Sequence, residues 1–301
     1  MVYVSCKTYN QSSFIKDALN GFCIQKTAFP FVCAIIDDAS TDGEPKVIRD
    51  YLYMHFALDD VSTVRRDETD DYSRVFVQHK ENKNCFFVIV CLKYNHYRIK
   101  KNKDIYVAEW MDEAKYTAIC EGDDYWTDPL KLQKQVDFME QHPNHSLCFS
   151  AHRNEYPNGG FRESHRYNLD LENCSVNDAI RHGGNYMATA TMLYRSDKAV
   201  NRPEWSIGLP IGDLPTMLVL LGRGECGYIN TVMVTYRVNA EGSWTRTMMN
   251  NKSKKLYLFS SVKKMYKAFD SWTHKKYHCS IVKRCLKIGF YSFRLKLGLL
   301  K

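Results

Sequence analysis

The sequence predicts an α/β fold with a mostly parallel central sheet, flanking helices and a basic helical C-terminal tail. Two short apolar runs near the N-terminus, Val2–Cys6 and Phe31–Ile36, are each followed by a turn and then by apolar residues at helical spacing. This strand–helix–strand–helix order is typical of parallel sheets, which bind ligands at the carboxyl ends of their strands. The segments that follow these strands are therefore the first candidates for a functional site.

The first two helices are predicted by apolar residues spaced three and four apart. Ser12 or Ser13 could cap the first helix, and the second follows the turn at 37–43. Residues 53–74 are polar and carry acidic clusters, which favours a loop or an excursion. The helical positions are Ile15, Ala18, Leu19, Phe22 and Cys23 in the first helix and Val47, Ile48, Tyr51 and Leu52 in the second.

The rest of the chain also shows apolar runs typical of strands and apolar residues at helical spacing. Thr127 and Pro129 have the residue types of a helix start, and Gly212–Pro215 begins another helical pattern that ends at Gly222. Apolar residues at helical spacing from Leu256 onward, and again over Ile281–Leu300, predict two C-terminal helices. Runs typical of strands are Val75–Gln78, Tyr116–Cys120, Ser146–Ala151 and Tyr228–Val238, and Cys85–Leu92 is strongly apolar.

The composition is that of a globular protein with an uneven charge distribution. Of 301 residues, 45% are hydrophobic and 25% are charged, which excludes disordered, collagenous and low-complexity architectures. The formal net charge is +8, but residues 252–301 hold 14 Lys and Arg against one acid, so they carry +13 and the remainder −5. We expect one domain over 1–250 and a basic amphipathic tail over 251–301 that favours an anionic surface.

The cysteines and the hydropathy pattern indicate which cellular compartment the protein occupies. Eleven cysteines are scattered from Cys6 to Cys285 without a Cys-x-x-Cys pair, and several lie in apolar runs. This favours a reducing compartment over a disulfide or zinc framework. No basic segment followed by an apolar core opens the chain, and no apolar run reaches about 18 residues, so neither a secretory signal nor a transmembrane helix is expected.

Carboxylates stand at two predicted strand ends. The pair Asp37 and Asp38 ends one strand, while the pair Asp123 and Asp124 ends another and precedes Tyr-Trp. Hard oxygen ligands of this kind suit Mg²⁺ or Mn²⁺, and these ions in turn hold phosphates. Any single Asp-Asp pair could instead cap a helix or form a turn. Because two such pairs occur at two strand ends, the sequence favours a ligand site.

Three segments resemble the signature motifs of the family 2 glycosyltransferases, in that family's order and close to its spacing. They are Val-Tyr-Val-Ser-Cys-Lys-Thr-Tyr-Asn-Gln at 2–11, Ile-Ile-Asp-Asp-Ala-Ser-Thr-Asp-Gly at 35–43 and Cys-Glu-Gly-Asp-Asp-Tyr-Trp-Thr-Asp-Pro-Leu-Lys-Leu at 120–132. The resemblance covers residues 1 to about 245. It implies a GT-A fold, with a nucleotide-sugar-binding half over 1–125 and an acceptor half over 126–250. It also implies sugar transfer from a nucleotide sugar, typically uridine-linked, with inversion at the anomeric carbon.

Carried over to this chain, the resemblance places Thr8, Tyr9 and Asp38 in the donor site. The Tyr9 ring would stack on the base, and the Asp38 carboxylate would accept a hydrogen bond from it. Tyr9 could alternatively be an aromatic turn residue. The family holds the diphosphate partly with an Arg between the second and third motifs. Lys93 could replace that Arg, or it could be a solvated surface lysine.

The same resemblance assigns the metal site and the catalytic base. The segment from Glu121 to Asp124 matches the family's DxD-type motif, with Glu121 in place of the first Asp. Asp123 would contact the ribose or the metal, and Asp124 would be the direct ligand of Mn²⁺ or Mg²⁺, which neutralises the departing diphosphate. Asp213 would take the proton of the acceptor hydroxyl. Asp213 could also be a helix N-cap, a role compatible with catalysis.

The segment Tyr-Arg-Val-Asn at 236–239 resembles one that the family writes as Tyr-Arg-x-His. In the family this segment lies over the diphosphate. Arg237 could pair with phosphate or with a structural carboxylate. Asn239 replaces the usual His, and it retains a hydrogen-bond donor.

The leading hypothesis is an inverting, metal-dependent glycosyltransferase of bacterial surface-polysaccharide assembly. Its partners would be a nucleotide-sugar donor and a saccharide or polyprenyl-linked saccharide acceptor, with no nucleic acid. The tail would bind an anionic membrane surface, which places the protein in the cytoplasm on the inner face of the membrane. The tail could instead be a packed helix pair with a solvated lysine face. The alternatives are a catalytically silent binding module and, less favoured because no Gly-rich phosphate loop follows the first strand, a sugar-nucleotide pyrophosphorylase.

Overall fold

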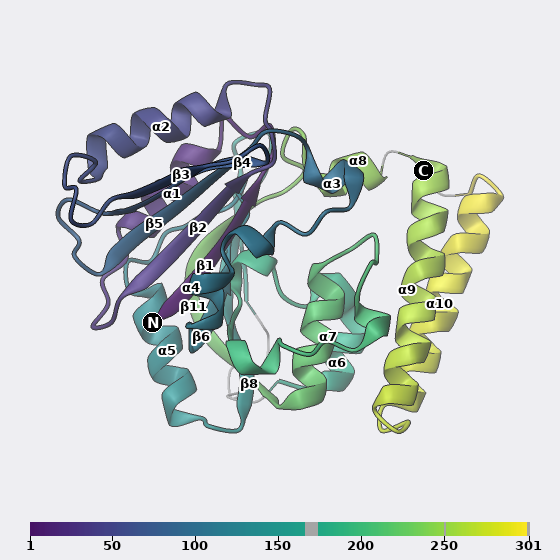
Figure 1. Ribbon diagram of the computed structural model, residues 1–301. Coiled ribbons are helices and arrows are strands. Elements are labelled where there is room, and N and C mark those ends of the chain that lie inside the picture. The colour runs from purple at the N-terminus through teal and green to yellow at the C-terminus, as the bar shows by residue number, and fades with distance from the viewer. Residues whose placement is uncertain (166–173, 250, 300–301) are drawn as a thin grey trace.

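The computed structural model describes residues 1–165, 174–249 and 251–299, and it shows one large twisted sheet with helices on both faces (Figure 1). The strands β1, β2, β5 and β6 pair in parallel, β1 with β2 and β6, and β2 with β5. The predicted α/β fold with a mostly parallel central sheet is therefore confirmed. The bounds are Val2–Thr8 for β1, Phe31–Asp37 for β2, Cys85–Leu92 for β5 and Tyr116–Ile119 for β6.

The second half of the chain extends the same sheet. The strand β10 (Leu193–Arg195) pairs antiparallel with both β6 and β8 (His145–Glu155), and β8 pairs in parallel with β11 (Glu225–Arg237). Two short strands, β7 (Tyr125–Trp126) and β9 (Phe161–Ser164), pair antiparallel with β11 and β8. Both halves of the chain therefore share one sheet.

The expectation of a loop over 53–74 is wrong in part. Residues Arg65–Glu68 form β3, which pairs antiparallel with β4 (Tyr72–Gln78), and β4 pairs with β5. The sequence Arg-Arg-Asp-Glu shows no apolar alternation because β3 is an exposed edge strand at one end of the sheet. Charged side chains are typical of edges that avoid pairing with other chains.

Helices cover the two faces of the sheet and create separate cores. On one face, α1 (Ile15–Cys23), α2 (Glu44–His55) and α5 (Lys131–Gln141) bury their apolar sides in one core, which includes alternate residues of β1 and β2, and α5 contacts β8. On the other face, α4 (Ala108–Asp112) packs on the β1–β2–β5 region. The helices α6 (Val176–His182) and α7 (Asp213–Arg223) pack with β8 and β11 in the third core.

Three predicted helix boundaries are wrong. The N-cap of α1 is Phe14, without a side-chain cap from Ser12 or Ser13. The helix α5 begins at Lys131 rather than at Thr127, because the Asp128 carboxylate accepts a hydrogen bond from the Leu130 N–H at 2.8 Å and closes a turn first. The helix α7 passes through Gly222 and ends at Arg223.

The C-terminal segment forms a helical hairpin at one side of the molecule (Figure 1). Its long helices are α9 (Lys252–Trp272) and α10 (His278–Lys296), preceded by the short α8 (Trp244–Met249). The two predicted helices are confirmed, although Leu300 lies outside the described residues. None of the described helices combines the length and the apolar character needed to cross a membrane. The remaining short helices are α3 (His96–Ile99) and the 3₁₀ turns Asp104–Tyr106, Gly183–Asn185, Thr189–Thr191, Ser196–Lys198 and Glu204–Ser206.

Candidate active site

The carboxyl ends of β1, β2, β5 and β6 lie at one edge of the sheet, and most of the predicted site residues follow them. In the strand register Thr8 pairs with Asp37, and Asp37 pairs with Cys91. The loops that follow β1, β2 and β5 therefore begin side by side. The turn at 121–124 follows β6 on the other side of β1. The fold therefore gathers the segments 8–11, 37–44, 93–104 and 121–124 at this edge.

A buried carboxylate that the sequence did not single out holds the loop after β1. Glu44, the first residue of α2, accepts hydrogen bonds from the Thr8 hydroxyl and, at 2.9 Å, from the Gln11 N–H. The Ser40 hydroxyl donates a hydrogen bond to the same carboxylate at 2.8 Å. Burial raises the pKa of Glu44. This network fixes the backbone on both sides of Tyr9, whose side chain is half-buried. The contact of Tyr9 with a base stays a prediction.

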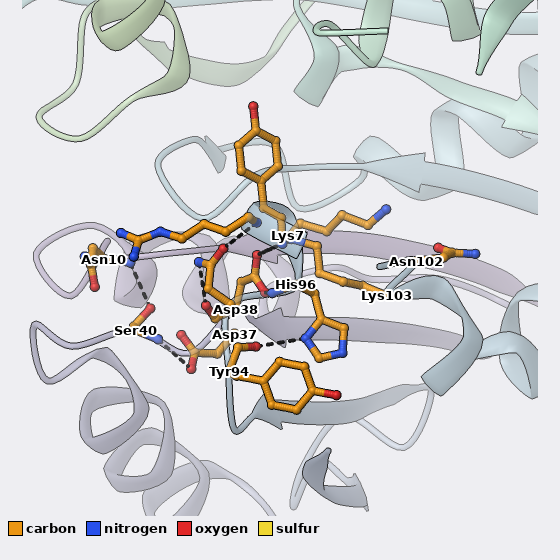
Figure 2. A network of polar contacts seen from close by, with 12 residues as sticks. Lys7, Asn10, Asp37, Asp38, Ser40, Tyr94, His96, Asn102 and Lys103 are labelled. Carbon is orange, nitrogen blue, oxygen red and sulfur yellow. Dashed lines mark hydrogen bonds and ion pairs between the residues drawn. The ribbon is translucent and has the colours of Figure 1, made fainter. Parts of the chain in front are cut away.

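Asp38 is buried and already has protein partners (Figure 2). One carboxylate oxygen accepts the His96 N–H at 2.7 Å, and the other accepts the Tyr97 N–H at 3.1 Å and the Lys103 ammonium at 2.6 Å. Asp38 thus fixes the start of α3, which follows the end of β5. Because each carboxylate oxygen offers two lone pairs, Asp38 retains the capacity to accept from a base, and that role stays a prediction.

The structure separates Lys93 from this network and brings in Lys103 instead. The Lys93 ammonium pairs with Glu68 on the edge strand β3 at 2.9 Å, and 42% of its side chain is exposed. Lys103 is 16% exposed and pairs with Asp38, while its neighbour Asp104 pairs with Lys7 at 2.8 Å. Lys103 is therefore, with Lys7, a cation that the fold places at the ends of β1 and β2 (Figure 2). The geometry favours the surface alternative for Lys93, and its contact with a diphosphate stays a prediction.

The turn from Glu121 to Asp124 packs tightly against the loop after β1. A Cβ atom added at Gly122 would lie 2.5 Å from the Gln11 side-chain oxygen and would overlap the Thr8 hydroxyl, so glycine allows this approach. Asp124 is buried, and its carboxylate accepts the Arg237 N–H at 2.9 Å. The turn is therefore fixed by contacts with β1 on one side and β11 on the other.

Three carboxyl groups belong to this turn, and a fourth lies within electrostatic range of it. Burial and the charges of Asp123 and Asp213 raise the pKa of Glu121 to about 8. Burial also raises the pKa of Asp123, and burial with the charges of Asp123 and Glu121 raises that of Asp124. Asp213 belongs to the second half of the chain, yet it lies close enough for its charge to act on Glu121. The start of α7 therefore lies within electrostatic range of the turn, and the roles of base and metal ligands stay predictions.

Asp213 is the first residue of α7, and Gly212 is the N-cap, so the predicted capping role is corrected. Its carboxylate accepts the N–H of the next residue, Leu214, at 2.7 Å. Burial raises the pKa of Asp213. A carboxylate whose pKa lies above its ordinary value is a better proton acceptor, provided that it stays ionised at the working pH.

Arg237 forms ion pairs, a hydrogen bond and a ring contact with other parts of the protein. Its guanidinium pairs with Asp17 on α1 and, at 3.2 Å, with Glu155 on β8, and it donates to the Asp123 carbonyl at 3.0 Å. It also lies 4.5 Å over the Tyr125 ring, and only 11% of its side chain is exposed. This geometry favours the structural-carboxylate alternative, and a phosphate contact stays a prediction. Asn239, two residues later, has a φ of 57°, a conformation that Asn tolerates better than most residues.

The donor set at the acidic turn fits a divalent cation held jointly with a ligand. The cations whose charges act on it, Lys7 and Arg237, are already paired with other carboxylates, and the raised pKa values mean that a divalent cation would bind here by displacing protons. Carboxylate oxygens suit Mg²⁺ and Mn²⁺. Within the described ranges, no three His, Cys, Asp or Glu side chains are grouped closely enough to hold a metal alone. Further oxygen ligands would come from the bound substrate or from water.

The chain is similar to curated proteins without an assigned activity. It is 31% identical over 242 residues to uncharacterized proteins of Mycobacterium tuberculosis and Mycobacterium bovis. The match covers 79% of this chain and 58% of each relative, so the chain spans less than two thirds of their length. No family model matches the sequence.

Solved glycosyltransferase structures share the fold. One is Staphylococcus aureus TarS (residues 1–349) in complex with UDP-GlcNAc, with a TM-score of 0.53 and 14% identity over 88% of this chain and 72% of that one. Another is the mannosyltransferase PcManGT of Pyrobaculum calidifontis in complex with GDP-Man and Mn²⁺, with a TM-score of 0.54 and 11% identity over 96% of this chain and 72% of that one. At these identities the likeness establishes the fold.

Proposed function

We propose that this protein is an inverting, metal-dependent glycosyltransferase of family 2. The observation that carries the proposal is the approach of Asp213 to the turn from Glu121 to Asp124, at the carboxyl ends of the parallel strands. These two segments are far apart in the sequence: the turn resembles the family's DxD-type motif, and Asp213 stands near a helix start in the second half, where the family has its base. Their meeting in space is what a donor site with an adjacent base requires.

The reaction would be a single displacement. The oxygen of an acceptor hydroxyl attacks the anomeric carbon of the donor sugar, and its proton passes to the Asp213 carboxylate. The bond between the anomeric carbon and the diphosphate oxygen breaks, and the electron pair leaves with the nucleoside diphosphate. The raised pKa of Asp213 and the hydrogen bond that orients it at the start of α7 support this role.

Asp123 and Asp124 would hold the cation, which supplies Lewis-acid neutralisation of the departing diphosphate when bound. The proximity of the Asp123, Asp124 and Glu121 carboxyl groups and the fixed position of Asp124 against β11 support this assignment. Glu121 would remain near the cation without a required contact. The Mn²⁺ in the complex of PcManGT agrees with this choice of metal.

The donor would be a uridine-linked sugar, and the acceptor a hydroxyl of a saccharide or a lipid-linked saccharide. The complexes of TarS with UDP-GlcNAc and of PcManGT with GDP-Man indicate that the fold accommodates either base. The uridine preference rests on the motif resemblance. Tyr9 and Asp38 would meet the base, because both stand at the strand ends that Glu44 and Lys103 hold in place.

The test is a screen of nucleotide sugars for binding and hydrolysis, with Mn²⁺ or Mg²⁺ and with chelator. We expect metal-dependent binding of one uridine sugar, loss of that binding in Asp124→Ala, and retained binding without turnover in Asp213→Asn. Asp59→Asn, at an exposed aspartate away from the acidic turn, is the matched control and should change neither.

Two results would overturn the proposal. If no nucleotide sugar binds with or without metal, the site is not a donor site, and a catalytically silent module becomes the better hypothesis. If Asp213→Asn turns over donor at the wild-type rate, the base has been assigned to the wrong residue. Circular dichroism of each variant separates these results from a failure to fold.

A further inference from the structure

The outer face of the C-terminal hairpin differs from the rest of the surface. The inner face of α9 is buried against the third core through Leu258, Val262, Met265, Tyr266 and Phe269. The helix α10 buries only Ile281, Ile288 and Leu295, on the side that faces α9 and α6. The remainder of α10 faces outward.

That outward side of α10 carries a continuous apolar stripe, which we call the α10 stripe. It consists of Val282, Leu286, Phe290, Phe293 and Leu297, which recur every three or four residues and therefore share one face of the helix. Their exposed fractions run from 40% at Val282 to 68% at Leu286. Large apolar side chains gathered on one exposed face mark an interaction surface.

Basic residues flank the α10 stripe on both sides. By helical position, Lys283, Lys287 and Arg294 lie along one flank. On the other flank, Lys263 and Lys296 line a groove of about 400 Å³ between α9 and α10 together with Leu256, Phe259 and Phe293. The one acid of residues 252–301, Asp270, is buried and pairs with His278 at 2.6 Å. The hairpin surface around the stripe is therefore apolar in the middle and positively charged at its borders.

A basic recess lies next to this surface, between α6 and the hairpin. It measures about 450 Å³, and its lining includes Arg181, Lys255, Arg284 and Lys287 but no acid. The Nε atom of Arg284 is buried and has no hydrogen-bond partner among the described residues. Such a recess suits a phosphate group. Lys287 belongs both to this recess and to the flank of the stripe.

We propose that the outer face of the hairpin docks on an anionic phospholipid membrane. The α10 stripe would insert at the boundary of headgroups and acyl chains, and the flanking lysines and arginines would meet the lipid phosphates. Charge complementarity selects this occupant, because the segment carries +13 and a second copy of the same face would be repelled. The inference is independent of the proposed enzymatic function.

The test is flotation of the full chain with vesicles of phosphatidylcholine alone or with phosphatidylglycerol added. We expect binding only to the anionic vesicles and weakening by added salt. The variant Leu286→Asp/Phe290→Asp should lose at least about tenfold in binding, and Lys283→Gln/Lys287→Gln/Arg294→Gln about a hundredfold. All five positions lie on the outer side of α10, so a common thermal midpoint with wild type checks that the variants fold.

Matched controls lie outside the hairpin. Val61→Asp/Val200→Asp changes two apolar residues that are 92% and 52% exposed, and Lys16→Gln/Lys26→Gln/Lys46→Gln removes three exposed charges. Both control variants should bind like wild type. The proposal is overturned if wild type binds neither kind of vesicle, if the stripe and control variants lose binding equally, or if the stripe variant converts a wild-type dimer into a monomer, since a second copy would then be the occupant.

Discussion

Replacing Lys131 by methionine should remove a component of stability that rises with pH above neutrality. Lys131 opens α5 and is fully buried, with its ammonium 2.6 Å from the Gln135 side-chain oxygen and 4.1 Å from the centre of the Trp126 ring. Within the described residues no carboxylate forms an ion pair with it. Burial therefore disfavours the charged form and lowers the pKa of Lys131 from 10.5 to about 8.

The sign and size of the effect follow from proton linkage. Below about pH 8 the lysine is protonated in both the folded and the unfolded chain, and folding carries the full cost of the buried charge, about 3 kcal/mol. As the pH rises from about 8 toward 10.5, the folded chain loses this proton before the unfolded chain does, so the free energy of unfolding increases. Between pH 7 and pH 9.5 the gain should be roughly 2 kcal/mol.

The measurement is urea unfolding of wild type and Lys131→Met at several pH values across that range. Other groups that titrate there contribute equally to both proteins, so the difference between the two free energies of unfolding isolates Lys131. Lys16→Met, at an exposed lysine of α1, is the matched control. If the difference in free energy of unfolding between wild type and Lys131→Met does not change with pH, the reasoning is refuted, because the ammonium would then be solvated in the folded state.

Two further predictions concern the acidic turn. Gly122→Ala should destabilise the protein by about 1–3 kcal/mol and weaken donor binding, because the new methyl group meets Thr8 and Gln11. Gly184→Ala, where the space is open, should cost less than about 0.5 kcal/mol, and equal midpoints in urea would contradict the packing argument. Arg237→Lys should cost about 2–3 kcal/mol, since lysine cannot bridge Asp17 and Glu155 at once. An unchanged midpoint would mean that these ion pairs are dispensable.

The fold was predictable where local pattern and tertiary environment agree. The strand β2 is buried at every position, so its sequence is a continuous apolar run, and α1 has one buried side and a clear helical spacing. Edge strand β3 could not be predicted, because its four charged residues are stabilised by pairing with β4 rather than by burial. The start of α5 was misplaced because Asp128 closes a turn with Leu130, a choice that its residue type leaves open.

The site was predictable to the extent that its residues belong to contiguous motifs. Asp123, Asp124 and Asp213 were identified from short segments, and the fold brings those segments together. Lys103 was missed because its partner Asp38 lies 65 residues away, and no local pattern distinguishes it from the other lysines of a basic loop. Glu44 was missed for a related reason, since a glutamate at the start of a helix is expected without any tertiary role.

The contacts of Arg237 bear on how the acidic turn would work. This residue joins α1 and β8 to the turn across 220 residues of sequence, so the position of Asp124 is set by the body of the protein before any ligand arrives. The Arg237 guanidinium forms its ion pairs with Asp17 and Glu155, while its backbone N–H holds the Asp124 carboxylate. A rigid group of carboxylates binds a divalent cation with little reorganisation, and the bound cation in turn attracts a diphosphate. A chelated donor and cation should therefore bind together, each strengthening the affinity of the other.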